Sequence, residues 1–170
     1  MSDFKGLFGD WEPDERPEGE DKSKRQDRRN SRECEVRVVD VYEGVYDSSG
    51  RGGEGTYFVL LRDNHNRELK IFLVRDVAMA IFMAIQNKAP DRPFTHDLLR
   101  NVIDKLGGKV ERVIVDDLMQ DTFYARILVE KGKETIEIDS RPSDAIALAL
   151  RFRAPIYVAE SVLEDAQGDK

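Results

Sequence analysis

Cysteine is almost absent from this sequence, with Cys34 the only one in 170 residues. A single thiol excludes an internal disulfide and a zinc site built from several thiolates. The chain also lacks an apolar run of about 18 residues, the length that a membrane-spanning helix needs. Its N-terminus has no hydrophobic segment of the kind that marks a secreted protein. We therefore expect a cytoplasmic protein with no membrane partner.

Recognisable catalytic signatures are missing too. The sequence has no metal-binding motif, no phosphate-binding glycine loop and no nucleophile elbow. Its formal net charge is −7, and an acidic protein does not bind nucleic acid through bulk charge, because that binding depends on neutralising phosphates. A function on nucleic acid would need a local basic patch or a bridging divalent metal ion.

Composition divides the chain into three parts. Residues 1–33 hold ten acidic and eight basic residues but few large apolar ones, so they cannot bury enough surface to fold and we expect a disordered charged tail. Residues 34–166 are long enough for a single domain with a real core. Residues 167–170 are expected to form a short C-terminal tail.

Hydrophobic periodicity predicts an α+β domain. Alternating or β-branched runs predict strands, and longer apolar stretches bounded by turn residues predict helices. The expected strands cover 35–45, 56–62, 68–74, 109–118, 122–130, 134–139 and 155–158, and the expected helices cover 76–87, 95–106, 140–154 and 160–166. Thr95 and Ser140 are the candidate N-caps of two of these helices.

An internal duplication is visible around two buried helices. Ile71–Pro90 overlays Ile136–Pro155 without gaps, and each segment follows a predicted hairpin. The domain is therefore expected to contain two strand–strand–helix halves joined in a mixed or antiparallel sheet around buried helices.

One half carries a polar turn that the other lacks. At the start of the second buried helix lie Asp139, Ser140, Arg141, Ser143 and Asp144. In the overlay Asp139 falls on Val74 and Asp144 falls on Met79, so one copy makes the same turn without these carboxylates. This difference favours a functional role for the turn.

Three segments resemble the bifunctional nuclease family, also called the BFN domain. They are RPFTHDLLRNVIDKLGGKVERVIVDDL, then FYARILVE, then IDSRPSDAIALALRFRAPIYVAESVL. The resemblance covers roughly residues 34–165 and implies a compact α+β domain, often a homodimer or higher oligomer, that degrades DNA and RNA. It implies no settled set of catalytic residues.

Phosphodiester hydrolysis needs an activated water and stabilisation of phosphoryl charge, which carboxylate-held Mg²⁺ or Mn²⁺ commonly supplies. Arg141 is a candidate phosphate contact, and His96 is a candidate general base or ligand. The candidate catalytic residues are Asp139, Arg141 and Asp144, followed by His96 and Asp97. The candidate metal ligands are Asp139, Asp144, Asp116 and Asp117, with Asp121 nearby.

A purely structural interpretation of the same residues stays open. Ser140 and Asp144 are ordinary helix-start residues, and Arg141 could pair with a carboxylate only to fix the turn. Thr95-His96-Asp97 is also a plain helix start, and Asp116-Asp117 is typical of the beginning of a turn. A non-catalytic oligomeric binding or regulatory module is therefore the alternative to a nuclease, with the turn as its ligand or partner site.

Overall fold

A computed structural model describes residues 32–44 and 56–168, which form seven strands and four helices. The tail predicted for residues 1–33 lies, up to residue 31, outside the described residues. The elements follow in the order β1 (Glu33–Gly44), β2 (Thr56–Asp63), β3 (Glu68–Leu73), α3 (Arg75–Ile85), α4 (Thr95–Lys105), β4 (Gly108–Met119), β5 (Thr122–Lys131), β6 (Glu134–Ser140), α5 (Pro142–Phe152), β7 (Ile156–Ala159) and α6 (Glu160–Gly168).

The strands form one mixed sheet in the order β3-β2-β1-β7-β4-β5-β6. Two antiparallel meanders, β1-β2-β3 and β4-β5-β6, are joined by β7, which pairs antiparallel with β1 and parallel with β4. A helix follows each meander, α3 after the first and α5 after the second. The α+β class and the two strand–strand–helix halves are confirmed.

The helix positions shift the overlay of the two halves by two residues. Both α3 and α5 have 11 residues, and their N-cap residues are Val74 and Arg141. By position in the helix, Asp144 therefore corresponds to Val77 and not to Met79. The first half still has no carboxylate at the place of Asp144.

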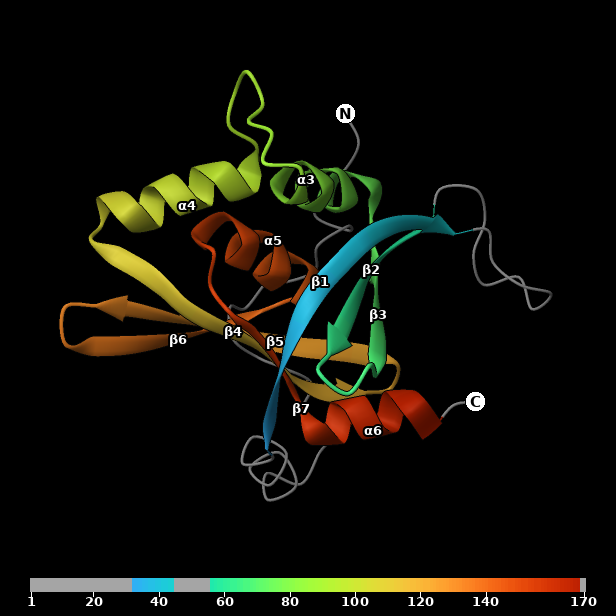
Figure 1. The fold of residues 1–170 in the computed structure, drawn as a ribbon. Coiled ribbons are helices and arrows are strands. Elements are labelled where there is room, and N and C mark those ends of the chain that lie inside the picture. Colours follow the sequence, from blue (N-terminus) through green and yellow to red (C-terminus); the bar gives the residue numbers. More distant parts are fainter. Residues whose placement is uncertain (1–31, 45–55, 169–170) are drawn as a thin grey trace, which may run out of the picture.

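Helix α5 lies at the centre of the core, between the sheet and the helices α3 and α4 (Figure 1). Residues 145–149 are all apolar, and none is more than 1% exposed. A helix without a polar face in its middle must be buried all round. None of the described helices is long and apolar enough to cross a membrane.

The structure corrects both predicted N-caps. Ser140 belongs to strand β6, and Arg141 is the N-cap of α5 because Pro142 keeps the preceding residue extended and itself occupies the first helical position. Thr95 is already inside α4, whose N-cap is Phe94. The Asp97 carboxylate accepts a hydrogen bond from the Phe94 backbone N–H at 2.9 Å and replaces the expected threonine cap.

Asp116 and Asp117 do not begin a turn, contrary to the prediction. Strand β4 runs on to Met119, with a register shift between Val115 and Asp117. Both carboxylates are buried: Asp117 accepts a hydrogen bond from the Leu118 backbone N–H, and Asp116 lies 3.2 Å from the guanidinium of Arg126. Burial inside the sheet, rather than exposure at a strand end, decides their environment.

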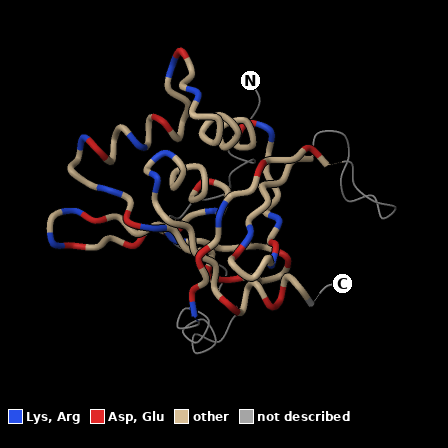
Figure 2. The backbone as a smooth tube through the Cα atoms, in the orientation of Figure 1, with Lys and Arg blue, Asp and Glu red and all other residues tan. Residues whose placement is uncertain are grey.

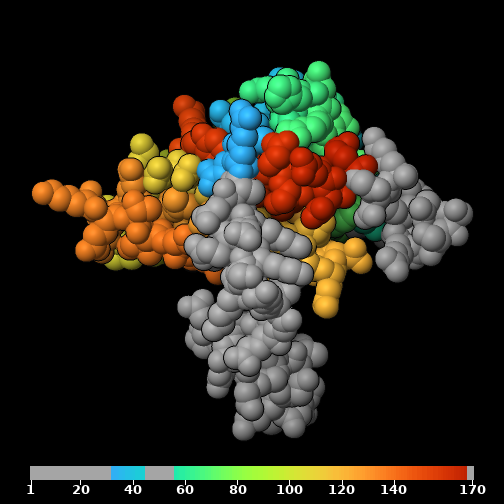
Figure 3. Space-filling model, turned by 90° about the horizontal axis from the view of Figure 1, so that it is seen from below, coloured from blue at the N-terminus to red at the C-terminus, as the bar shows by residue number. Residues whose placement is uncertain are grey.

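Helix α6 lies below the β2–β3 hairpin, at the surface seen from beneath (Figures 1 and 3). An ionic cluster ties it to the sheet. Arg67, in the hairpin turn, contacts Glu160 of α6 through two nitrogens and Asp63 of β2 through Nε at 2.7 Å. The thiol of Cys34 in β1 donates to Glu160 as well. The cluster therefore fixes β1, the hairpin and α6 to one another.

Candidate functional site

The predicted polar turn lies where β6 passes into α5. Arg141 is extended (φ −68°, ψ 142°), and Asp144 is the third residue of the helix. This placement puts a carboxylate in the first helical turn, where the partial positive charge of the helix N-terminus favours it.

Asp144 is bound from two sides. His96, at the start of α4 and 48 residues earlier in the sequence, places Nε2 at 3.0 Å from Asp144 Oδ1. Arg141 Nε donates to the other carboxylate oxygen, Oδ2, at 2.6 Å. The side chain of His96 is 9% exposed, that of Asp144 28% and that of Arg141 68%. The site is thus layered, with the imidazole buried, the carboxylate half-buried and the guanidinium in solvent.

The electrostatics of the turn keep Asp144 ionised. The hydrogen bond from His96, followed by that from Arg141, lowers the pKa of Asp144 from its ordinary 3.8 to about 2, against the opposing effect of burial. The hydrogen bond to Asp144 in turn raises the pKa of Arg141. An ionised carboxylate can only accept hydrogen bonds, so Nε2 of His96 carries the hydrogen between them.

Asp97, next to His96, faces a different partner. Its Oδ1 accepts a hydrogen bond from Nε of Arg151, near the other end of α5, at 2.6 Å. Burial acts to raise the pKa of Asp97, but the hydrogen bonds from Arg151 and the Phe94 backbone outweigh it and lower the pKa. Asp97 anchors α4 to α5 and does not join the carboxylate of Asp144.

The remaining predicted residues lie elsewhere. Asp139 pairs in register with Arg126, whose neighbours Ala125 and Ile127 are buried in the core. Directly paired residues share a face of the sheet and successive residues alternate faces, so Asp139 lies on the face turned away from α5. Of the predicted catalytic residues, the structure brings together His96, Arg141 and Asp144.

Comparison with known proteins identifies the family of this chain. The model of the bifunctional nuclease domain matches residues 59–170. The chain belongs to the bifunctional nuclease domain family. It is 42% identical over 109 residues to an uncharacterized protein of Mycobacterium tuberculosis, a match that covers 64% of this chain and 65% of that protein.

Two plant relatives carry the family's name. Bifunctional nuclease 2 of Oryza sativa subsp. japonica is 30% identical over 105 residues, which cover 60% of this chain and 32% of that protein. Bifunctional nuclease 1 of Arabidopsis thaliana is 28% identical over 101 residues, which cover 58% and 31%. The match therefore spans about a third of each plant protein.

The side chains of this bifunctional nuclease domain that could act as metal ligands decide which metal ion it could hold. Within residues 32–44 and 56–168, no group of three or more His, Cys, Asp or Glu side chains is placed to bind one ion. Mg²⁺, however, is usually held by one or two carboxylates together with substrate phosphates and waters. Asp144 fits this sparse mode, because it is half-buried and each of its oxygens has a lone pair beyond the one that His96 or Arg141 uses.

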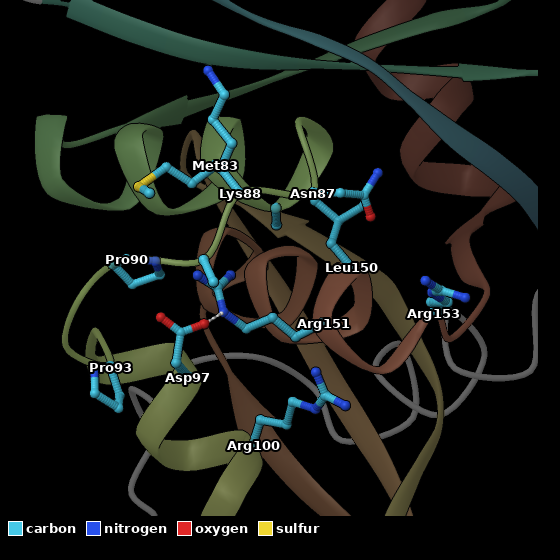
Figure 4. A pocket seen from close by; sticks show the side chains of 12 residues that line it. Met83, Asn87, Lys88, Pro90, Pro93, Asp97, Arg100, Leu150, Arg151 and Arg153 are labelled. Carbon is cyan, nitrogen blue, oxygen red and sulfur yellow. Dashed lines mark hydrogen bonds and ion pairs between the residues drawn. The ribbon is translucent and has the colours of Figure 1, made fainter.

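Sequence reasoning missed a pocket of about 450 Å³ between the ends of α3 and α5 and the start of α4. Four of its lining residues are basic and one is acidic: Lys88, Arg100, Arg151, Arg153 and Asp97 (Figure 4). A signal for it was present in the sequence. The repeated triplets Lys88-Ala89-Pro90 and Arg153-Ala154-Pro155 follow the two helices, and both repeats contribute to the pocket.

Proposed function

We propose that this protein is a nuclease that hydrolyses phosphodiester bonds in DNA and RNA, in the cytoplasm, with little sequence preference. Membership of the bifunctional nuclease domain family and the names of the plant relatives support the reaction class. The observation that carries the site is the contact of His96 with Asp144 beside the exposed guanidinium of Arg141. Exposure therefore increases from the imidazole of His96 to the carboxylate of Asp144 and then to the guanidinium of Arg141.

Each of the three residues has a distinct role in this proposal. The Nη atoms of Arg141 bind the phosphoryl oxygens, for which a guanidinium fork is well shaped. Asp144, ionised and half-buried, orients the attacking water. His96 is a positioning residue, since its Nε2 faces Asp144 and its ring is nine-tenths buried.

The reaction consumes one water. The water oxygen forms a bond to phosphorus as the ester P–O bond breaks, and the proton that the water loses is balanced by one that the departing oxygen takes up from solvent. Mg²⁺ or Mn²⁺, which we propose is held by Asp144 and the substrate phosphate, would supply Lewis acidity and a more acidic water. Arg141 offsets the charge that builds up on the phosphoryl oxygens.

The test is cleavage of labelled single- and double-stranded DNA and RNA by highly purified full-length protein, with Mg²⁺, Mn²⁺ or EDTA. We expect Arg141→Ala to lower the rate by about 10²-fold or more, as loss of a charge-stabilising donor does. Asp144→Ala should abolish cleavage. His96→Ala should lower it by about 10- to 100-fold, and His96→Gln, which keeps an N–H donor, should recover part of the loss.

Asp165→Ala is the matched control, because Asp165 is an exposed carboxylate on α6 far from the turn in sequence. Melting curves of every variant establish that it is folded. Equal, trace cleavage by wild type, Asp144→Ala and Asp165→Ala would point to a contaminating enzyme and reject the proposed site. Cleavage that EDTA leaves unchanged would reject the metal ion but not the residues.

A homo-oligomer is the second part of the proposal, and an exposed apolar face on α4 favours it. The predicted apolar stripe of α4 does not pack on the core, apart from the partly buried Ile103. The side of α4 left open, together with its N-cap and C-cap residues, exposes large apolar side chains by 40–65%: Phe94, Leu98, Leu99, Val102 and Leu106. Such a contiguous patch is typical of a protein interface. The same face also favours the alternative, a non-catalytic oligomeric binding or regulatory module with the turn from Asp139 to Asp144 as its ligand or partner site.

A further inference from the structure

The pocket at the ends of α3 and α5 is positively charged in an acidic protein. Its four basic and one acidic lining residues give a local net charge of +3, against −7 for the whole chain. Elsewhere along the described chain, basic and acidic residues are interspersed or, as in α6, mainly acidic (Figure 2). The pocket is therefore a local basic site of the kind that an acidic nuclease needs in order to hold its substrate.

The floor of the pocket is already neutralised. Arg151 is 6% exposed, and its three nitrogens donate to Asp97 and to the backbone carbonyls of Ala147 and Ala80 (Figure 4). These bonds connect α3, α4 and α5. Arg151 is thus a structural residue that holds the pocket walls together.

The rim carries the cations that remain for a ligand. Lys88 and Arg153 are exposed, and neither forms an ion pair with any residue that the structure describes. Arg100 is half-exposed, 3.6 Å from Asp104, and stacks over the Phe152 ring. Unpaired cations around a concave surface fit an anion, and the planar guanidinium of Arg153 suits a phosphate.

The first turn of α4 connects this pocket with the proposed catalytic turn. His96 contacts Asp144 and its neighbour Asp97 contacts Arg151. Asp144 and Arg151 are seven residues apart in α5, which is about 10.5 Å along the helix axis. A duplex rises by about 3.4 Å along its axis for each nucleotide of one strand, so a strand running parallel to α5 would cover the distance from Asp144 to Arg151 in about three nucleotides.

We propose that the pocket rim formed by Lys88, Arg100 and Arg153 binds the phosphodiester backbone of a nucleic-acid strand, a few nucleotides from the bond cleaved at Asp144. The choice of nucleic acid as the ligand rests on the proposed nuclease function. Each half of the domain supplies one of these cations after its helix, Lys88 three residues past the end of α3 and Arg153 one residue past the end of α5.

The test measures binding of a fluorescein-labelled single-stranded DNA by anisotropy over a series of salt concentrations. EDTA is present, and a gel verifies that the strand stays intact. Full-length wild type is compared with Lys88→Ala/Arg153→Ala. The matched control is Lys131→Ala/Lys133→Ala, which removes two exposed cations at the tip of the β5–β6 hairpin (Figure 1), neither of which lines the pocket.

We expect the pocket variant to bind at least about tenfold more weakly at low salt. The slope of log K against log salt should fall by about 1.4, because each lost phosphate contact on a single strand removes about 0.7. The control should change neither value. If the double variant is unstable, the single variants Lys88→Ala and Arg153→Ala should each reduce the slope by about 0.7. Equal binding by the pocket variant and the hairpin control would overturn the inference.

Two further arms separate the possible causes. In the first, inorganic phosphate is added to wild type and to the pocket variant. If it raises the melting temperature of wild type alone and does not compete with the oligonucleotide, the pocket binds a small free anion and the inference is overturned. Cleavage that survives Asp144→Ala would reject the proposed catalytic turn, whereas weak oligonucleotide binding by the pocket variant would still support the backbone site.

Discussion

Replacing Asp144 by Asn separates the charge of this side chain from its shape. Asparagine keeps the size and one oxygen that can accept the His96 N–H, but it loses the attraction to Arg141. Lowering the pKa of Asp144 from 3.8 to about 2 corresponds, at about 1.36 kcal/mol per pKa unit, to about 2 kcal/mol of folding free energy. The carboxylate is 28% exposed, so solvent screening makes this value an upper bound.

The sign of the effect fixes its pH dependence. A carboxylate whose pKa is lower in the folded state stabilises the protein fully above its ordinary pKa of 3.8, and this contribution is lost as the pH falls towards about 2. We therefore expect Asp144→Asn to lower the free energy of unfolding by up to about 2 kcal/mol near neutral pH. The difference from wild type should nearly vanish close to pH 2.

Urea unfolding at several pH values measures this difference. Asp165→Asn is the control, and as an exposed substitution it should change the free energy of unfolding by less than about 0.5 kcal/mol at every pH. A loss in Asp144→Asn that is the same at neutral and acidic pH would show that packing or hydrogen-bond geometry, and not charge, stabilises the turn. No loss at all would refute the reasoning that His96 and Arg141 stabilise the ionised carboxylate.

Three other predictions concern the ionic cluster at α6, the thiol of Cys34 within it, and the open face of α4. Hydrogen bonds from Arg67, and then from Cys34, lower the pKa of Glu160 from 4.5 to about 2. Glu160→Gln should therefore lower the free energy of unfolding by up to about 3 kcal/mol near neutral pH, and by progressively less below about pH 4.5. An unchanged urea midpoint would contradict this. Burial, and next the hydrogen bond to Glu160, raises the pKa of the Cys34 thiol, so alkylation of Cys34 should be slow in wild type and faster in Glu160→Gln. If α4 forms the interface between copies, Leu98→Lys/Leu106→Lys should shift the sedimentation of the full-length protein to that of a monomer. The control Lys105→Glu, on the same helix, should leave sedimentation unchanged. Identical sedimentation of wild type and the leucine variant would reject this face as the interface.

Periodicity was enough to predict the elements of this fold, because apolar alternation and buried runs are properties of neighbouring residues. The hairpin between β2 and β3, the buried middle of α5 and the short strand β7 all lie where the sequence patterns indicate. The helix starts were predicted less well. The N-cap of α5 is Arg141 and not Ser140, because Pro142 occupies the first helical position and keeps the residue before it extended, a local effect that outweighs the capping preference of serine.

The candidate site shows a sharper limit of sequence reasoning. Asp144 and Arg141 are three residues apart on one helical turn, so their pairing can be expected from spacing alone. His96 meets Asp144 only because α4 crosses α5, and no local pattern encodes that crossing. Asp139 is predicted in the same cluster because it is near in sequence. Successive side chains of β6 point to opposite faces of the sheet, however, and that of Asp139 lies on the face turned away from α5.

The duplication explains why the two proposed sites differ in origin. Both halves contribute a cation to the pocket, because the two triplets follow helices that end side by side. The proposed catalytic turn belongs to one half alone. Where α5 has Arg141 and Asp144, α3 has Val74 and Val77, and α3 still starts after an extended residue. A helix can therefore start at this place in the fold without the charged pair. A functional role explains the presence of Arg141 and Asp144 better than a structural one. That argument fails if Arg141→Val/Asp144→Val, the exchange that copies the first half, leaves cleavage of DNA and RNA intact.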